Sequence, residues 1–377
     1  MLPDATEQNR IFEYVKTCRR QLHAIPELSE CEFETSEYIA KRLTELGLKF
    51  TKIHTGMYAD IDGESPGERI ALRCDMDGLP IEEKTDSEFR AKKNMHACGH
   101  DGHMAIVLGT AKWLSEHKPR CGVRLIFQFG EEGDGGADKM IKAGVLDGVD
   151  EIYAFHLCPE LEKGKLSSVC GAMFAGTAEF DVEVCGKASH CADREKGADA
   201  FVACKMFADE CETTEKQRTD IRIHIGKAEI GSARNIVADK GRLFCTFRYF
   251  DVSSRDSVLS SLSAALTRID ARAGTQSRIA VKAVYPPLVN SAAALKRLKS
   301  VANVEDCEPR YTAEDFAFYT EKIDGCMAWL GIKDEKYCSP LHSDTFGFKE
   351  SALMTGVQTM IKLVCDNDNG EDNVENI

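Results

Sequence analysis

The sequence has no apolar run that approaches the ~18 residues needed to cross a membrane. Its first twenty residues contain Asp4, Glu7 and Glu13 and lack the apolar core of a secretory signal. None of its 16 cysteines forms a Cys-x-x-Cys pair, and their spacing is unlike that of small secreted domains. These absences argue against a membrane protein and a disulfide scaffold. They predict a cytoplasmic protein whose thiols are mostly reduced.

Positive charge is also scarce in this chain. The 48 Lys and Arg residues are outnumbered by 62 Asp and Glu residues, which gives a formal net charge of −14. A nucleic-acid partner is therefore not expected, because nothing would offset the repulsion of the phosphates. A small anionic substrate stays open, since one local basic group is enough to bind it. The acidic run 366–376 is predicted to be solvated or disordered.

The first half of the chain alternates between strand and helix patterns. Its 377 residues are enough for two domains of ordinary size. A break at Pro26 separates two helices, and Gly47 closes the second. The predicted helices are 11–25, 31–46, 101–117 and 137–143, and the predicted strands are 69–75, 123–129 and 151–156. This alternation predicts an α/β domain, with a mostly parallel sheet covered by helices on both faces.

From about Gly176 the pattern changes to a different order of elements. The predicted strands are 178–187, 220–230, 241–251 and 278–285, and the predicted helices are 195–213 and 257–273. This βαββαβ order predicts a ferredoxin-like domain at 176–285. After Pro286 and Pro287 the first pattern resumes. We therefore predict a discontinuous catalytic domain of 1–175 and 286–377, interrupted by the inserted domain.

The densest group of metal-binding side chains lies at 94–103, in the sequence Asn-Met-His-Ala-Cys-Gly-His-Asp-Gly-His. Borderline-soft donors at this density are rare outside metal sites. Cys98 and His100 are two positions apart, so an extended or turning segment can point both the same way. Gly99 between them lets the backbone approach an ion closely.

Other polar residues follow the predicted strands of the sheet. These are Asp75, Asp77, Glu131, Glu132 and His156. The carboxyl ends of strands in open α/β sheets are where ligands bind, so we expect these side chains to gather there.

Five of the candidate donors suffice for a pair of metal ions. They are Cys98, His100, Glu132, His156 and His342. Two ions ~3.5–4 Å apart need about this many protein ligands and a shared water. The adjacent pair Glu131 and Glu132 suits a division of labour, in which one carboxylate binds metal and the other takes a proton from that water. Asp77 is placed to orient a ligand or the base.

These motifs resemble the di-metal amidohydrolases of the aminoacylase and carboxypeptidase type. The nearest branch holds hippurate hydrolases, auxin-conjugate hydrolases and N-acyl-amino-acid deacetylases. The resemblance extends over nearly the whole chain. It rests mainly on 75–80 (Asp-Met-Asp-Gly-Leu-Pro), 96–101 (His-Ala-Cys-Gly-His-Asp) and 131–133 (Glu-Glu-Gly). The segments 19–29 and 340–343 and a weaker match at 312–317 support it.

The resemblance implies a role for each site residue. Cys98 would bind or bridge two divalent ions, zinc or manganese, together with His100, Glu132, His156 and His342. Glu131 would be the general base, and Asp77 would orient the site. In the inserted domain, His190 would stabilise the oxyanion, within its own subunit or across a homodimer formed through that domain. Asn235 and Arg248 would bind the amide and the carboxylate of the substrate.

The resemblance predicts a metal-dependent amidohydrolase that cleaves N-acyl amino acids to a carboxylic acid and a free amino acid. The alternatives are a dipeptidase or exopeptidase on the same scaffold, and a metal-binding relative without catalysis. A thiol redox protein is disfavoured by the missing Cys-x-x-Cys pair. The chain departs from the family pattern at Ala313, at 191–194 after His190, and at Asp344, where relatives commonly carry proline. These departures leave the metal ligands intact and put substrate preference in doubt.

Overall fold

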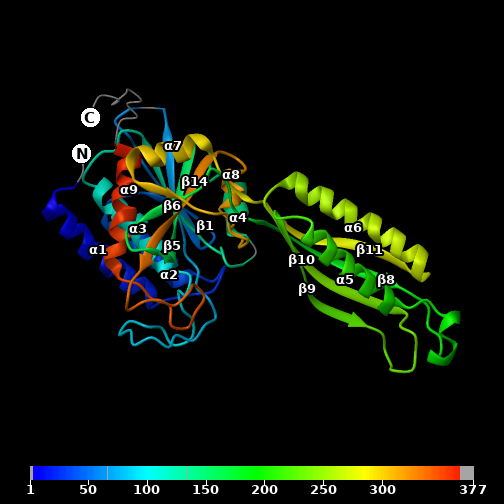
Figure 1. Cartoon of the computed structure of the whole chain (residues 1–377). Coiled ribbons are helices and arrows are strands. Elements are labelled where there is room, and N and C mark those ends of the chain that lie inside the picture. Colours follow the sequence, from blue (N-terminus) through cyan, green and yellow to red (C-terminus); the bar gives the residue numbers. More distant parts are fainter. Residues whose placement is uncertain (1–2, 66, 134, 366–377) are drawn as a thin grey trace. The chain divides into compact units, whose positions relative to one another are not determined.

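The computed structural model describes residues 3–65, 67–133 and 135–365, and the acidic run 366–376 lies outside them. The chain divides into two compact units (Figure 1). Unit 1 comprises the described residues of Met1–Met173, Val289–Glu308 and Phe318–Ile377, and unit 2 comprises Phe174–Leu288 and Pro309–Ala317. Among the described residues, no helix is both long enough and apolar enough to cross a membrane.

Unit 1 is built on an eight-stranded sheet of order β1-β2-β4-β3-β5-β14-β6-β13. Its central strands β4, β3, β5 and β14 run parallel, and they are almost wholly buried. Strands buried on both faces read as continuous apolar runs, which is why the sequence revealed them. The bounds are β1 Phe50–Ile53, β2 Gly56–Ile61, β3 Arg69–Asp75, β4 Gly122–Gln128, β5 Glu151–Glu162, β6 Leu166–Ser168, β13 Val304–Asp306 and β14 Asp324–Lys333.

Two crossover helices fix the layers of this sheet. Helix α3 (His100–Leu114) joins β3 to β4, and α4 (Gly136–Lys142) lies between β4 and β5. The connection from β3 leads to its neighbour β4 on one side. The connection from β4 leads in the opposite direction, past β3, to β5. Because parallel crossovers are right-handed, the two helices lie on opposite faces. The mixed α/β fold with a large, mostly parallel sheet is thus confirmed.

Further helices pack in unit 1, where one hydrophobic core includes α1, α3 and α9 residues. Helix α1 begins earlier than we predicted, because Asp4 and Glu7 form a capping box before Ile11. Gly47, at φ 72°, follows the C-terminus of α2, as predicted. The remaining elements are α1 Ala5–His23, α2 Phe33–Glu45, α7 Ala292–Val301, η2 Glu350–Ala352 and α9 Leu353–Cys365.

The prediction that the third strand ends at His156 is wrong. Strand β5 continues to Glu162, because β14 pairs with it along nearly its whole length. Pairing with β3 on its other side ends much earlier, at the Arg73–Ala154 pair. By this register His156 lies level with Asp75, the last residue of the neighbouring strand β3, although it is inside its own strand.

Unit 2 has the element order βαββαβ, with an antiparallel sheet of order β11-β8-β10-β9. Alternate β8 residues are buried in a second hydrophobic cluster together with residues of both helices. The predicted apolar stripe Val258, Leu262, Leu266 and Ile269 is buried. The elements are β8 Gly176–Cys185, η1 Cys191–Lys196, α5 Ala200–Lys216, β9 Ile221–Ile230, β10 Lys240–Tyr249, α6 Val252–Ala273 and β11 Gln276–Tyr285.

One predicted helix of this unit begins at the wrong residue. We expected it from 195, but α5 begins at Ala200 after its N-cap, Asp199. The preceding residues form the separate turn η1, and Gly197 between the two is extended. Short elements at the passage between the units complete the fold, namely β7 Gly171–Phe174, β12 Leu288–Asn290 and α8 Ala317–Thr320.

Candidate metal centre

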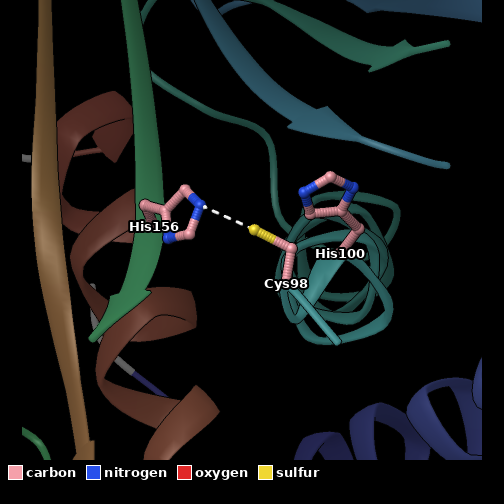
Figure 2. A group of neighbouring side chains, drawn as sticks. All are labelled: Cys98, His100 and His156. Carbon is pink, nitrogen blue, oxygen red and sulfur yellow. Dashed lines mark hydrogen bonds between the residues drawn. The ribbon is translucent and has the colours of Figure 1, made fainter. Parts of the chain in front are cut away.

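Cys98 and His100 project from the turn that opens helix α3. Gly99 between them is the N-cap at φ 88°, a left-handed conformation that favours glycine. A Cβ at this position would also meet Leu157 Cδ1 at 2.8 Å. His100 Nδ1 lies 2.8 Å from the backbone oxygen of Asp77, which orients the ring and leaves Nε2 for another partner. Figure 2 shows Cys98 between His100 and His156.

His156 approaches the same point from strand β5. Its Nδ1 lies 2.9 Å from the backbone oxygen of Leu157, and its Nε2 lies 3.4 Å from Cys98 Sγ (Figure 2). Both imidazoles are therefore held by a main-chain carbonyl through Nδ1 and present Nε2 to the centre. This arrangement is typical of histidines that bind metal.

Glu132 and His342 come from loops and approach the same sulfur. His342 Nε2 lies 3.3 Å from Cys98 Sγ and 3.2 Å from Glu132 Oε1. The backbone of His342 has φ 62°, rare for a residue with a side chain, and its N–H donates to Ala97 O at 2.9 Å. Such strain is common at functional sites, where the surroundings hold it in place.

The five predicted ligands thus form two triads that share one sulfur. One triad is Cys98, His100 and His156, and the other is Cys98, Glu132 and His342; the donor atoms of each lie within 4.8 Å of one another. His100 Nε2 and Glu132 Oε1 are buried and have no aligned hydrogen-bond partner among the described residues. Buried polar atoms normally have partners, so the donor set fits a pair of divalent ions centred on Cys98.

The charge around these donors also favours a cation. Burial alone would lower the pKa of His100, but Asp75 and then Asp77 raise it to about 10. Glu131 Oε2 and Glu132 Oε1 each lie 4.0 Å from His100 Nε2. Burial raises the pKa of Cys98, and the nearby carboxylates raise it further. A proton at His100 is thus stabilised by the same field that would stabilise a metal ion.

Asp77 connects the ligands with the proposed base. Its two carboxylate oxygens accept hydrogen bonds from the backbone N–H groups of Glu131 and Glu132, at 3.1 and 2.9 Å. Ser29 donates a third bond at 2.6 Å, and His100 Nδ1 lies 3.3 Å away. Burial would raise the pKa of Asp77, but His100 and these donors lower it. One carboxylate therefore sets the position of the Glu131–Glu132 turn.

Four residues that hold this centre received no specific role from the sequence, although Asp75 was expected at this edge of the sheet. Ser29 binds Asp77, and Glu32, fully buried, accepts from Gly130 N at 2.8 Å. Asp75 accepts from His103 Nδ1 at 2.7 Å and from Arg73 at 2.8 Å. Ser29, Asp75 and His103 stand inside or beside the motifs, but a motif does not show which atoms are paired.

The predicted oxyanion-stabilising residue, His190, and the two predicted substrate-binding residues, Asn235 and Arg248, all lie in unit 2. His190 and Asn235 are exposed and belong to paired segments, because Cys191 N donates to Asn235 O at 3.0 Å. Arg248 is half-buried on β10 and donates to Thr246 Oγ1 at 2.6 Å and to Thr177 Oγ1. Thr177 and Arg248 pair near one end of the sheet, whereas Cys185, five residues before His190, lies at the other.

Comparison with known proteins identifies the family of this chain. The model of the peptidase family M20/M25/M40 matches residues 71–366. The chain belongs to this family. The match spans both units and includes every predicted ligand. A solved member, the Bacillus subtilis YXEP protein, is described as a dinuclear metal binding peptidase of family M20; it is 29% identical, with a TM-score of 0.85 over 96% of this chain and 98% of that one.

Two relatives carry substrate names. The N-acetyl-L-cysteine deacetylase of Bacillus subtilis (strain 168) is 35% identical over 351 residues, 89% of this chain and 84% of the relative. An N-acetyldiaminopimelate deacetylase of Oenococcus oeni is 32% identical over 91% of this chain and 95% of its own. A putative aminohydrolase from methicillin-resistant Staphylococcus aureus has a TM-score of 0.89 at 29% identity, covering 95% of this chain and 98% of its own. Membership in this family makes the chain a metal-dependent amidohydrolase.

Proposed function

We propose that this enzyme removes the acyl group of small N-acyl amino acids, with N-acetyl amino acids as its preferred class. The observation that carries the proposal is the pair of triads sharing Cys98, with Glu131 beside them and outside both. The names of the two deacetylase relatives support acetyl as the acyl group. Cys98, His100, Glu132, His156 and His342 would hold two divalent ions.

The bound ions would supply Lewis acidity, polarising the amide carbonyl and lowering the pKa of water. Thiolate, imidazole and carboxylate donors suit zinc, and manganese is the second candidate. The identity of the metal ions does not change the roles proposed for the protein side chains.

Glu131 is the proposed general base and acid. Its side chain is 10% exposed, its backbone N–H is held by Asp77, and its Oε2 lies 4.0 Å from His100 Nε2, at the edge of the centre. As water attacks the acyl carbon, Glu131 takes one proton from it. Glu131 then delivers that proton to the amide nitrogen, the C–N bond breaks, and a carboxylate and an amine leave.

Substrate recognition falls to the three residues of unit 2. Arg248 would bind the carboxylate of the amino acid, since a guanidinium matches that group in charge and shape. Asn235 would bind the amide, and His190 would stabilise the oxyanion. Burial lowers the pKa of Arg248, but an arginine keeps its charge at neutral pH.

The distance between Arg248 and His190 within unit 2 supports a site shared between two subunits. Thr177, the partner of Arg248, and Cys185 are eight positions apart along β8, which corresponds to ~27 Å of strand. His190 lies beyond that end, so one substrate of amino-acid size cannot touch both residues of one unit. We therefore propose a homodimer in which His190 and Asn235 act in the partner's site.

We further propose that 176–285 is a ferredoxin-like inserted domain with a lid and dimerisation role, and that 1–175 and 286–377 form the catalytic domain. The sheet order of unit 2 supports this assignment. All 16 cysteines lie in described residues and no disulfide joins any two of them, which supports a reducing, cytoplasmic setting.

A substrate panel tests the proposal. The purified enzyme, loaded with Zn²⁺ or Mn²⁺, is assayed with N-acetyl-L-cysteine, N-acetyldiaminopimelate, an N-benzoyl amino acid and a dipeptide. We expect the highest kcat/KM for an N-acetyl amino acid. Preference for the dipeptide would instead establish the peptidase alternative, and no release of amine from any substrate would reject the hydrolase.

The base assignment needs a variant that keeps the metal. Glu131→Gln preserves size and removes the proton acceptor, so kcat should fall by at least ~10² while metal content stays unchanged. Glu13→Gln, at an exposed position on α1, is the matched control and should keep full activity. An active Glu131→Gln enzyme would contradict the assignment.

A further inference from the structure

The backbone of Leu157 lies where strand β5 outruns its neighbour. The register with β3 ends at Ala154, three residues earlier. At Leu157 the N–H donates to His103 Nε2 at 3.0 Å, and the C=O accepts from His156 Nδ1 at 2.9 Å. The His103 side chain, from α3, thus takes the place that a residue of β3 would occupy if the strand pairing continued. Both backbone groups of Leu157 are bound to histidine rings.

Both nitrogens of His103 are used in this arrangement. Because Nε2 accepts from Leu157, its proton is assigned to Nδ1, which donates to Asp75 Oδ1 at 2.7 Å. Asp75 is held in turn by Arg73, and Arg73 Nε donates to Gln128 at 2.9 Å. The side chains in this chain of bonds are at most 2% exposed. His103 is therefore fixed from two sides.

The side chain of Leu157 is confined as closely as its backbone. A Cβ added to Gly99 would lie 2.8 Å from Leu157 Cδ1, and a Cβ added to Gly102 would lie 2.9 Å from the same atom. The two glycines thus allow the first turn of α3 to pack directly against β5. Leu157 is fully buried, and its peptide has little freedom to move away from the His156 ring.

We infer that His103 is a positioning residue for the metal ligand His156 and acts through the Leu157 peptide. His103 holds the N–H of Leu157, and the C=O of the same residue fixes the His156 ring with Nε2 towards Cys98. Asp75, His100 and His103 also lie close enough to hold an ion themselves. That reading would use a nitrogen of His103 that already has a partner, since Nδ1 is bound to Asp75 and Nε2 to Leu157. The inference rests on the proposed function only for the assignment of His156 as a ligand.

Two amide variants separate the two bonds of His103. In His103→Gln the side-chain oxygen can reach the Nε2 position and accept from Leu157, whereas in His103→Asn the side-chain nitrogen takes the Nδ1 position and donates to Asp75. Co²⁺ is titrated into the metal-free full-length protein, and its visible absorption reports the number and type of ligands. This readout uses no substrate, so an inactive enzyme would not affect it.

His103→Asn should lower the affinity for one of the two bound Co²⁺ ions by ~10–100-fold, which is the usual cost of losing a bond that orients a ligand. It should also change the Co²⁺ absorption, while His103→Gln keeps both close to those of the unaltered protein. Retained Co²⁺ affinity in both variants would overturn the inference. An equal loss of affinity in both variants would also overturn it, because the bond to Leu157 would then make no difference. A loss of affinity in His103→Gln alone would make Asp75 the important partner instead. Circular dichroism of each variant verifies the fold before titration.

Discussion

Gly99 combines a left-handed backbone with a tight contact, and replacing it with alanine tests the packing around the centre. Alanine at φ 88° costs ~1–2 kcal/mol of strain, offset by ~0.4–1 kcal/mol from the stiffer unfolded chain. The new methyl would lie 2.8 Å from Leu157 Cδ1, and such overpacking costs ~1–3 kcal/mol. We therefore expect Gly99→Ala to lower the free energy of unfolding by about 2–4 kcal/mol.

Gly171 provides a matched control in the same unit. Its φ is 87°, and a Cβ built there meets no atom within 4 Å among the described residues. Gly171→Ala therefore introduces the backbone strain without a close side-chain contact, and it should lower the free energy of unfolding by about 1 kcal/mol. The difference between the two variants isolates the contact with Leu157.

Both tryptophans of the chain, Trp113 and Trp329, lie in unit 1 together with the two glycines. Urea unfolding of the metal-free protein, followed by tryptophan fluorescence, therefore reports the relevant unit. If Gly99→Ala is no less stable than Gly171→Ala, then Leu157 yields easily and the close packing of α3 on β5 is not a constraint.

Two further predictions concern the subunit interface and the pH dependence of stability. If His190 acts across a dimer, mixing inactive His190→Ala and Glu131→Gln proteins should restore up to about a quarter of the activity, because a mixed dimer contains one intact site; no recovery would place His190 in its own subunit's site. His23 is buried between Asp101 (2.8 Å) and Glu83 (3.0 Å). Burial alone would lower its pKa, but these carboxylates raise it above 6.5. The stability gained from protonated His23 is therefore full below pH 6.5 and lost as the pH rises through the higher folded-state pKa. The difference in unfolding free energy between the unaltered protein and His23→Gln should shrink accordingly in urea titrations from about pH 5 to about pH 9; a constant difference would mean that His23 is neutral in the fold.

Local chemistry decided what the sequence could reveal. The central strands are buried on both faces, so their composition alone identified β3 and β4. The donors around Cys98 were visible because metal binding requires particular atoms, and several of these occur together at 96–103. The edge strand β1 and its neighbour β2 are short and gave no comparable pattern.

Tertiary structure decided which of these atoms meet. The end of β5 depends on β14, which is more than 160 residues away in the sequence, so the local pattern stopped it at His156. The bonds of His103 to Asp75 and Leu157 depend on where α3 packs against the sheet. Spacing along the chain identifies which groups can bind. Only the folded chain determines which partner each one receives, because those partners come from elements distant in sequence.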